Sequence, residues 1–184
     1  MTKPLTLGTL LGGVILFAWG AVYHAVLPFA NQAFLGFTNE ETVTQAIVAN
    51  APRSGVYFLP YIPQDKGDAA MKAAEEKMTR GPFVLASVRV GPMSSMGALL
   101  GTQFVLDLLT AFFLTLLLLH ARPKSYGGRV AFLVGVALGG WLAISAPSWN
   151  WYSFSGGYVV AELGDVGIGF ALAGLALAKI APRS

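Results

Sequence analysis

YVVAELGDVGIGFALAGLALA, residues 158–178, is apolar enough to cross a lipid bilayer, although it contains the two carboxylates Glu162 and Asp165. A helix needs about 20 apolar residues to cross the hydrocarbon core. This stretch lies in a candidate span at 157–180, and three more stretches reach a comparable length, at residues 5–27, 97–119 and 130–146. The sequence therefore predicts a membrane all-α bundle of four transmembrane helices.

The composition of the whole chain indicates the same class. Of 184 residues, 55% are hydrophobic and 11% are charged, which is a low share of charge for a soluble domain of this size. The net charge is +3, but lysine and arginine are spread along the chain beside apolar runs, so they indicate topology rather than nucleic-acid binding. Cysteine is absent, which excludes disulfides, thiolate metal sites, c-type haem attachment and cysteine nucleophiles.

Lysine and arginine gather on one side of the predicted membrane. Lys3 precedes the apolar run of the first span, and Lys179 and Arg183 lie at the end of the fourth. The loop before the third span contains Arg122, Lys124 and Arg129. The opposite loop, residues 147–156, has no charge. Under the positive-inside rule both termini are expected in the cytoplasm of a bacterial cell, with residues 29–96 and 147–156 outside its inner membrane. The aromatic side chains expected at that outer surface are Trp149, Trp151, Tyr152 and Tyr158.

Residues 29–96 separate a first span within residues 1–28 from the spans within 97–184 and have a water-soluble composition. Their capping, proline and β-branched patterns predict a small α+β insertion in the order helix, strand, helix, strand. Its six acidic and six basic residues cancel, so it offers no one-sided field to a nucleic acid. It has no phosphate loop, nucleophile elbow or zinc-protease motif. A small periplasmic cap or docking surface is the remaining interpretation.

Every predicted span carries small residues four positions apart. The pairs are Gly8 with Gly12, Gly97 with Gly101, Gly135 with Gly139, and Gly169 with Ala173. In lipid such pairs mark helix faces that approach another backbone closely. The spacing leaves open whether the other helix belongs to the same chain or to a partner, although four spans with short loops favour an intramolecular bundle.

Five polar side chains are expected in the outer half of the membrane. At about 1.5 Å per residue, Glu162 lies about 7 Å deep, Asp165 about 12 Å and Asp107 about 16 Å. On the same count Gln103 lies about 10 Å deep and His24 about 6 Å. No lysine or arginine lies inside a span at these depths. The carboxyl groups must therefore be neutral, reached by water, bound to a cation, or paired with a basic residue from a partner or from Arg89 of the insertion.

Two hypotheses follow for these residues. In the first, His24, Gln103, Asp107, Glu162 and Asp165 form one cluster that passes protons or binds Mn, Fe or Zn, with His24 and the three carboxylates as candidate metal ligands. In the second they are separate packing or interfacial groups. A bis-histidine haem within one chain is disfavoured, because His120 lies at the opposite end of its span from the level of His24.

Three stretches carry a resemblance: FAWGAVYHAVLPF in the first span, SWNWYSF after the third and AELGD in the fourth. Together they resemble a group of uncharacterised bacterial four-helix inner-membrane proteins that have a periplasmic insertion between the first two helices. The resemblance implies topology and location, and it transfers no activity and no functional residue.

The predicted function is that of a non-catalytic accessory or stabilising subunit in a larger membrane complex, with other membrane subunits or further copies of the chain as partners. The alternative is a proton- or metal-handling membrane enzyme or transporter. Convergence of the polar side chains would distinguish the two, because a shared site requires them to meet.

Overall fold

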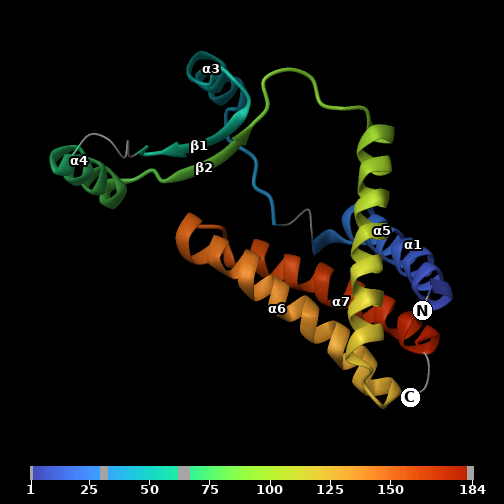
Figure 1. Ribbon diagram of the computed structural model, residues 1–184. Helices are drawn as coiled ribbons and strands as arrows, with labels where there is room; N and C mark the ends of the chain where they lie inside the picture. The colour runs from blue at the N-terminus through green and yellow to red at the C-terminus, as the bar shows by residue number, and fades with distance from the viewer. Residues whose placement is uncertain (1, 30–32, 62–66, 182–184) are drawn as a thin grey trace. The chain divides into compact units, whose positions relative to one another are not determined.

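The computed structural model describes residues 2–29, 33–61 and 67–181. Four of its helices are long and apolar enough to cross a membrane (Figure 1): α1 (Thr2–Ala25), α5 (Met96–Ala121), α6 (Tyr126–Tyr152) and α7 (Gly156–Ile180). The predicted fold class is confirmed, and the chain is a multi-pass integral membrane protein. It divides into a membrane unit, residues 1–34 and 94–184, and an insertion unit, residues 35–93.

Helix α6 extends further than the predicted 130–146. It continues through Pro147 to Tyr152, where Ser153 ends it in a left-handed conformation with φ 58°. Proline removes one hydrogen bond from the helix, but spanning helices tolerate it when side chains and neighbouring helices satisfy the freed groups. The aromatic residues Trp149, Trp151 and Tyr152 therefore lie on the last turns of α6 rather than in a loop.

Serine caps begin the last three spans. The hydroxyl of Ser95 accepts a hydrogen bond from the Ala98 amide, that of Ser125 from the Gly128 amide, and that of Ser155 from the Tyr158 amide, at 3.3, 3.0 and 3.1 Å. Each cap satisfies one of the amides that the first turn of a helix leaves without a partner. The connections from α5 to α6 and from α6 to α7 are short, and α6 and α7 lie side by side.

Helix α1 lies between α5 and α7, and glycines allow its close approach. A Cβ atom on Gly8 would lie 2.5 Å from Thr115 Cγ2, and one on Gly13 would lie 2.6 Å from Leu108 Cδ2. On α7, a Cβ on Gly169 would lie 2.9 Å from Trp19 Cδ1. These distances are shorter than real Cβ contacts, so a larger residue at any of the three positions would force the neighbouring side chain or helix to shift.

Two of the four predicted glycine faces have no such neighbour. Within 4 Å of an added Cβ there is no atom at Gly97, Gly101, Gly135 or Gly139 among the residues that the structure describes. The structure thus assigns the small residues of α1 and α7 to contacts within the chain. The faces on α5 and α6 lie outside these contacts.

All four spans converge at one end only, the end that carries the chain termini, here called the terminal end. Buried leucines form the cluster there: Leu114, Leu118 and Leu119 of α5, Leu133 of α6 and Leu177 of α7, with Leu5 of α1 packed against them. Toward the other end, here called the insertion end because residues 35–93 join it, α5 leaves α6 and α7 (Figure 1). There α5 keeps contact with α1, for example through the edge-to-face rings of Phe17 and Phe104 at 5.3 Å.

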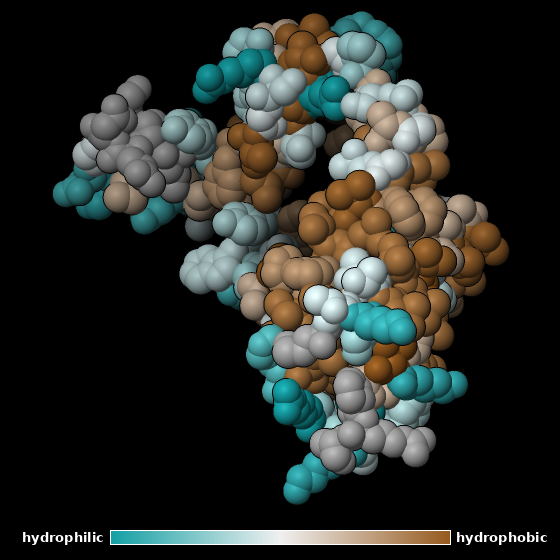
Figure 2. Space-filling view, turned by 45° about the vertical axis from the view of Figure 1, so that its right-hand side comes forward, coloured by the Kyte–Doolittle hydropathy of each residue, from teal (hydrophilic) through white to brown (hydrophobic). Residues whose placement is uncertain are grey.

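Apolar side chains cover the outside of these helices, as expected of surfaces that face lipid. Figure 2 shows them over the middle of the membrane unit, with hydrophilic side chains toward the terminal end. Leu7, Leu109 and Leu142 are among the large apolar residues that are at least half exposed. Hydrocarbon chains or other helices would cover this surface in a membrane.

The insertion unit has the predicted order: α3 (Glu40–Asn50), β1 (Gly55–Leu59), α4 (Gly67–Arg80) and β2 (Val84–Val88). The strands pair antiparallel with Gly55 opposite Val88 and Leu59 opposite Val84. Within the described part of this unit, only Ala51, Pro60 and Ala74 are buried. The unit is therefore a two-stranded ribbon with two helices and almost no core of its own.

Candidate intramembrane polar site

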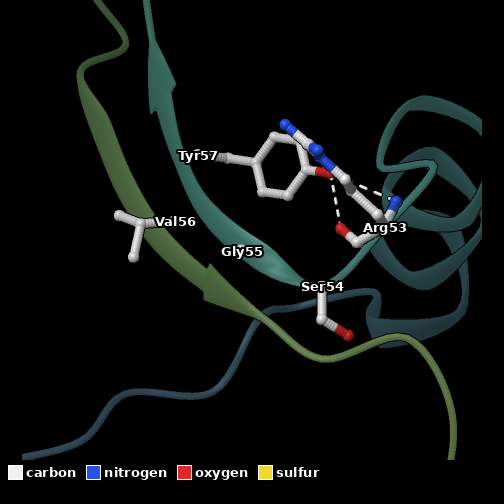
Figure 3. A pocket seen from close by; sticks show the side chains of 5 residues that line it. All are labelled: Arg53, Ser54, Gly55, Val56 and Tyr57. Atoms are coloured by element: carbon white, nitrogen blue, oxygen red, sulfur yellow. Dashed lines mark hydrogen bonds between the residues drawn. The ribbon is translucent and has the colours of Figure 1, made fainter.

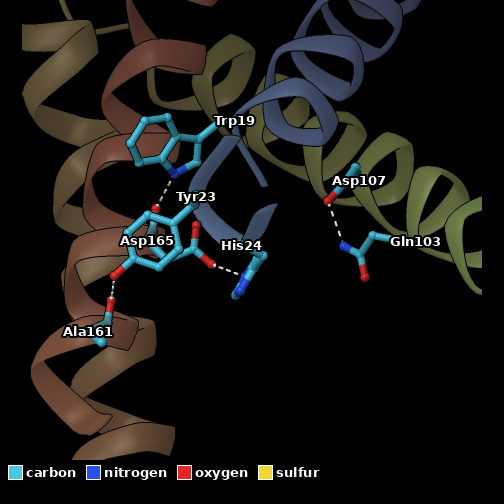
Figure 4. A network of polar contacts seen from close by, with 7 residues as sticks. All are labelled: Trp19, Tyr23, His24, Gln103, Asp107, Ala161 and Asp165. Carbon is cyan, nitrogen blue, oxygen red and sulfur yellow. Dashed lines mark hydrogen bonds and ion pairs between the residues drawn. The ribbon is translucent and has the colours of Figure 1, made fainter. Parts of the chain in front are cut away.

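Helix α1 is fastened to α7 by three side chains near the insertion end (Figure 4). Trp19 Nε1 donates to the main-chain oxygen of Asp165 at 2.9 Å, and the Tyr23 hydroxyl donates to the main-chain oxygen of Ala161 at 2.5 Å. His24 Nε2 lies 3.0 Å from Asp165 Oδ2, an ion pair when the imidazole is protonated. Trp19 and Tyr23 are four residues apart, as are their two acceptors, so one face of α1 meets one face of α7.

The glycines of the ELGDVGIG stretch make room for this fastening. A Cβ on Gly164 would lie 3.3 Å from the Tyr23 hydroxyl, and Gly169 lies under the Trp19 ring. The ring centroids of Trp19 and Tyr23 are 5.6 Å apart. The small residues of α7 therefore allow two aromatic side chains to reach main-chain oxygens, each of which has a second lone pair to accept a bond.

A second polar pair lies on α5. Gln103 Nε2 donates to Asp107 Oδ1 at 3.0 Å, one turn along the same helix, and Gln103 is exposed. No hydrogen bond joins this pair to His24 or to the Asp165 side chain in the described residues (Figure 4). Asp107 nevertheless lies within electrostatic range of Asp165.

Glu162 belongs to neither pair, because its side chain interacts with the hydroxyl of Tyr158 one turn earlier on α7. The five candidate residues thus divide into His24 with Asp165, Gln103 with Asp107, and Glu162 by itself. Among the described residues there is no group of three or more His, Asp or Glu side chains placed to hold a metal ion. His120 bonds through Nδ1 to the Leu116 oxygen at 2.8 Å, at the terminal end of α5.

Arg129 has a role that the sequence analysis did not assign. Its side chain is only 5% exposed, and Nη1 donates to the main-chain oxygens of Ala178 and Ala181 at 3.1 and 2.9 Å. Nε donates to the Pro123 oxygen at 3.1 Å. A cation at the C-terminus of α7 satisfies its last carbonyls and complements the helix dipole. The sequence did contain an indication of this role. A basic residue is unfavourable in the first turn of its own helix, here α6, unless its charge interacts with another helix.

Helix α6 holds α7 in the same manner as α1 does. Trp141 Nε1 donates to the Val159 oxygen at 3.0 Å, and the Tyr126 hydroxyl donates to the Leu175 oxygen at 2.9 Å. Main-chain oxygens along much of α7 therefore accept hydrogen bonds from both neighbouring helices. Such bonds are suited to lipid, where no water competes for the donor.

A shallow pocket in the insertion unit is lined by residues 53–57 (Figure 3). The Tyr57 hydroxyl donates to the Arg53 main-chain oxygen at 2.6 Å and accepts from the Arg53 amide at 3.4 Å. All the lining residues come from one continuous segment at the start of β1. Ligand sites usually bring polar groups from several elements together, so this pocket offers little for recognition.

Comparison of the chain with protein-family models, curated proteins and solved structures found no match. The fold and the polar contacts define the class as a four-span integral membrane protein. Its polar groups at membrane depth are used mainly to join helices.

Proposed function

We propose that this protein is a non-catalytic accessory or stabilising subunit of a larger membrane complex. The observation that carries the proposal is the pair of unoccupied glycine faces, Gly97 with Gly101 on α5 and Gly135 with Gly139 on α6. In the same chain, neighbouring side chains occupy the space beside Gly8, Gly12 and Gly169. Because glycine pairs in spanning helices serve close helix contact, the empty faces are suited to helices of another subunit.

The insertion unit supports the same proposal. Its strands carry apolar residues on both faces of the ribbon, and Val56 and Leu59 are 70% and 52% exposed. A two-stranded ribbon is marginally stable alone and gains stability from a third strand or from a covering surface. A complex that covers the ribbon as well as the glycine faces would use both regions of the chain.

We place this complex in a bacterial inner membrane, with both termini in the cytoplasm. The support is the charge distribution, since Lys3, Lys124 and Lys179 lie at the terminal end of their helices or in the loop there. Positive charge favours the cytoplasmic side.

Native mass spectrometry after gentle extraction from the natural membrane tests the proposal. The expected result is an assembly heavier than the 19.4 kDa chain that contains a different protein in fixed proportion. Substitution of both Gly135 and Gly139 by isoleucine should dissociate it. Gly140→Ile is the matched control, because Gly140 is also exposed without a neighbour but lies about 100° around α6 from Gly139. A monodisperse single chain in every sample would contradict the proposal.

The His24–Asp165 pair favours a second candidate function, the binding or transfer of protons at the membrane. Histidine is the side chain whose charge changes most readily between pH 5 and 8. Vesicles that contain the protein and a pH-sensitive dye test this candidate. Faster proton entry that His24→Asn abolishes and His120→Asn leaves intact would favour it over the accessory role, and entry equal to that of empty vesicles would dismiss it.

A further inference from the structure

A polar stripe runs along the insertion-end half of α5. Gln103, Asp107 and Thr110 follow one another at spacings of four and three residues, which places them on one helix face. Gln103 is exposed, and Asp107 and Thr110 are half-buried. Leucines border the stripe, with Leu99 39% and Leu106 50% exposed. Polar groups within leucines are typical of a face that meets another spanning helix rather than lipid.

Asp107 is the unbalanced charge of this stripe. The ion pairs found within the described residues are His24 with Asp165 and Arg80 with Glu76, so no basic side chain there lies within 4 Å of Asp107. One hydrogen bond from Gln103 reaches the carboxyl group, although an ionised carboxylate can accept about four. A carboxylate inside a span costs several kcal/mol unless it is paired or neutralised.

We propose that the stripe docks a membrane-spanning helix of another protein, and that this helix carries a lysine or arginine at the depth of Asp107. This inference rests on the proposed accessory function and names the chemistry of one partner. Charge complementarity selects the occupant, because a basic side chain neutralises Asp107 and donates to its second oxygen while its apolar helix packs on the leucines.

A second copy of the chain does not meet this requirement. The lysine and arginine residues within the described spans are Lys3, Arg129 and Lys179, near the terminal end of α1, α6 and α7. Asp107 lies 14 residues, about 21 Å, from the terminal end of α5. Two copies inserted in the same direction place their aspartates at equal depth, so neither copy brings a lysine or arginine to the carboxylate of the other, and His24 already contacts Asp165 of its own chain.

The packing of α5 leaves room for this occupant. Its contacts with α6 and α7 are made through Leu114, Leu118 and Leu119, which are one to three turns closer to the terminal end than Thr110 or Asp107. Lipid chains could cover the leucines but would supply no partner for the polar atoms of Gln103 and Asp107 that lie outside their mutual hydrogen bond. A helix with a basic residue satisfies both groups.

Fluorescence energy transfer in phosphatidylcholine vesicles tests the inference. The full chain lacks cysteine, so a single cysteine added after residue 184 takes the donor dye. The probes are acceptor-labelled synthetic helices of about 23 leucines and alanines, identical except for one lysine or one leucine at the depth of Asp107. We expect the lysine helix to associate about ten-fold more tightly than the leucine helix.

Asp107→Asn should reduce binding of the lysine helix to the level of the leucine helix. Glu162→Gln is the matched control, because it removes another carboxylate at the same end of the spans and should leave the ten-fold difference intact. A probe with its lysine moved two turns toward the terminal end tests the same point on the unaltered protein and should bind like the leucine helix. This arm remains informative if Asp107→Asn fails to fold.

Equal binding of the lysine and leucine helices would overturn the inference, as would a lysine effect that survives Asp107→Asn. Energy transfer between two labelled copies that Asp107→Asn abolishes would also overturn it, because the occupant would then be a second copy. In each of these three cases a native complex that dissociates when Gly135 and Gly139 are replaced would leave the accessory function standing. The two proposals therefore fail separately.

Discussion

The two ends of the membrane unit are built on different principles. At the terminal end, leucines from three spans interlock around Leu118, Leu133 and Leu177, and Arg129 satisfies the last carbonyls of α7. Toward the insertion end α5 leaves α6 and α7, and polar side chains replace leucine: His24 with Asp165 on one side and Gln103 with Asp107 on the other. The leucine packing at the terminal end stabilises the fold of the single chain. The insertion end holds the polar groups whose hydrogen-bonding capacity the chain uses only in part.

Gly13→Leu should have the largest effect, because it disturbs the close packing of α1 against α5. An added Cβ would lie 2.6 Å from Leu108 Cδ2 and 3.0 Å from Leu108 Cα, so α1 and α5 would have to separate. We expect a loss of about 3 kcal/mol in the free energy of unfolding, measured by denaturant titration in detergent. Gly20→Leu on the same helix, where no neighbour lies within 4 Å, is the control. Equal losses in the two variants would mean that α1 does not approach α5 as described.

Arg129→Gln should have the next largest effect on the free energy of unfolding. The substitution removes the cation that donates to Ala178 and Ala181 and leaves buried carbonyls without donors, at a cost of about 2 kcal/mol. Lys124→Gln, at an exposed position in the preceding loop, should change the free energy of unfolding by less than about 0.5 kcal/mol. Similar small losses in both variants would show that Arg129 serves topology alone.

Tyr23→Phe tests the hydrogen-bonded contact between α1 and α7 near the insertion end. It removes one hydroxyl and the hydrogen bond to the Ala161 oxygen, while the ring contact with Trp19 remains. We expect a loss of about 1 kcal/mol. The double variant with Trp19→Phe should lose less than the sum of the two single variants, because both bonds hold the same pair of helices. Strict additivity would argue against one shared contact.

The smallest effect is expected from His24→Asn. The substitution removes the imidazole whose Nε2 lies 3.0 Å from Asp165 Oδ2. The His24 side chain is 61% exposed, so solvent screens the pair and limits its contribution to about 0.5 kcal/mol. Denaturant titration in detergent should show a loss of this size in His24→Asn and no larger loss in His120→Asn, whose histidine bonds to a main-chain oxygen of its own helix. A loss in His24→Asn as large as that in Arg129→Gln would contradict a solvent-screened contact.

Sequence patterns were sufficient for the fold class because four apolar stretches of spanning length have few alternative structures. They were insufficient for the end of α6, since Pro147 resembles a stop signal in water and is tolerated in a spanning helix. The order of the insertion elements followed from capping and proline patterns, and Asn39 is the residue that caps α3.

The candidate site shows a sharper limit of sequence analysis. Depth along a helix could be counted from residue numbers, and it placed His24, Asp107 and Asp165 in the same half of the membrane. Depth does not give the direction of a side chain around its helix or the order in which helices pack, and α1 lies between α5 and α7. Trp19 and Tyr23 were missed because their acceptors are main-chain oxygens, which no sequence pattern marks.

Photo-crosslinking in the natural membrane tests the central claim most directly, namely that another protein covers the faces the chain leaves open. A photoreactive amino acid at Gly135 should yield one adduct of defined mass with a different protein, whereas the same amino acid at Gly140 should react mainly with lipid. Lipid adducts alone at both positions would contradict the account, because the glycine face of α6 would then be covered by the bilayer.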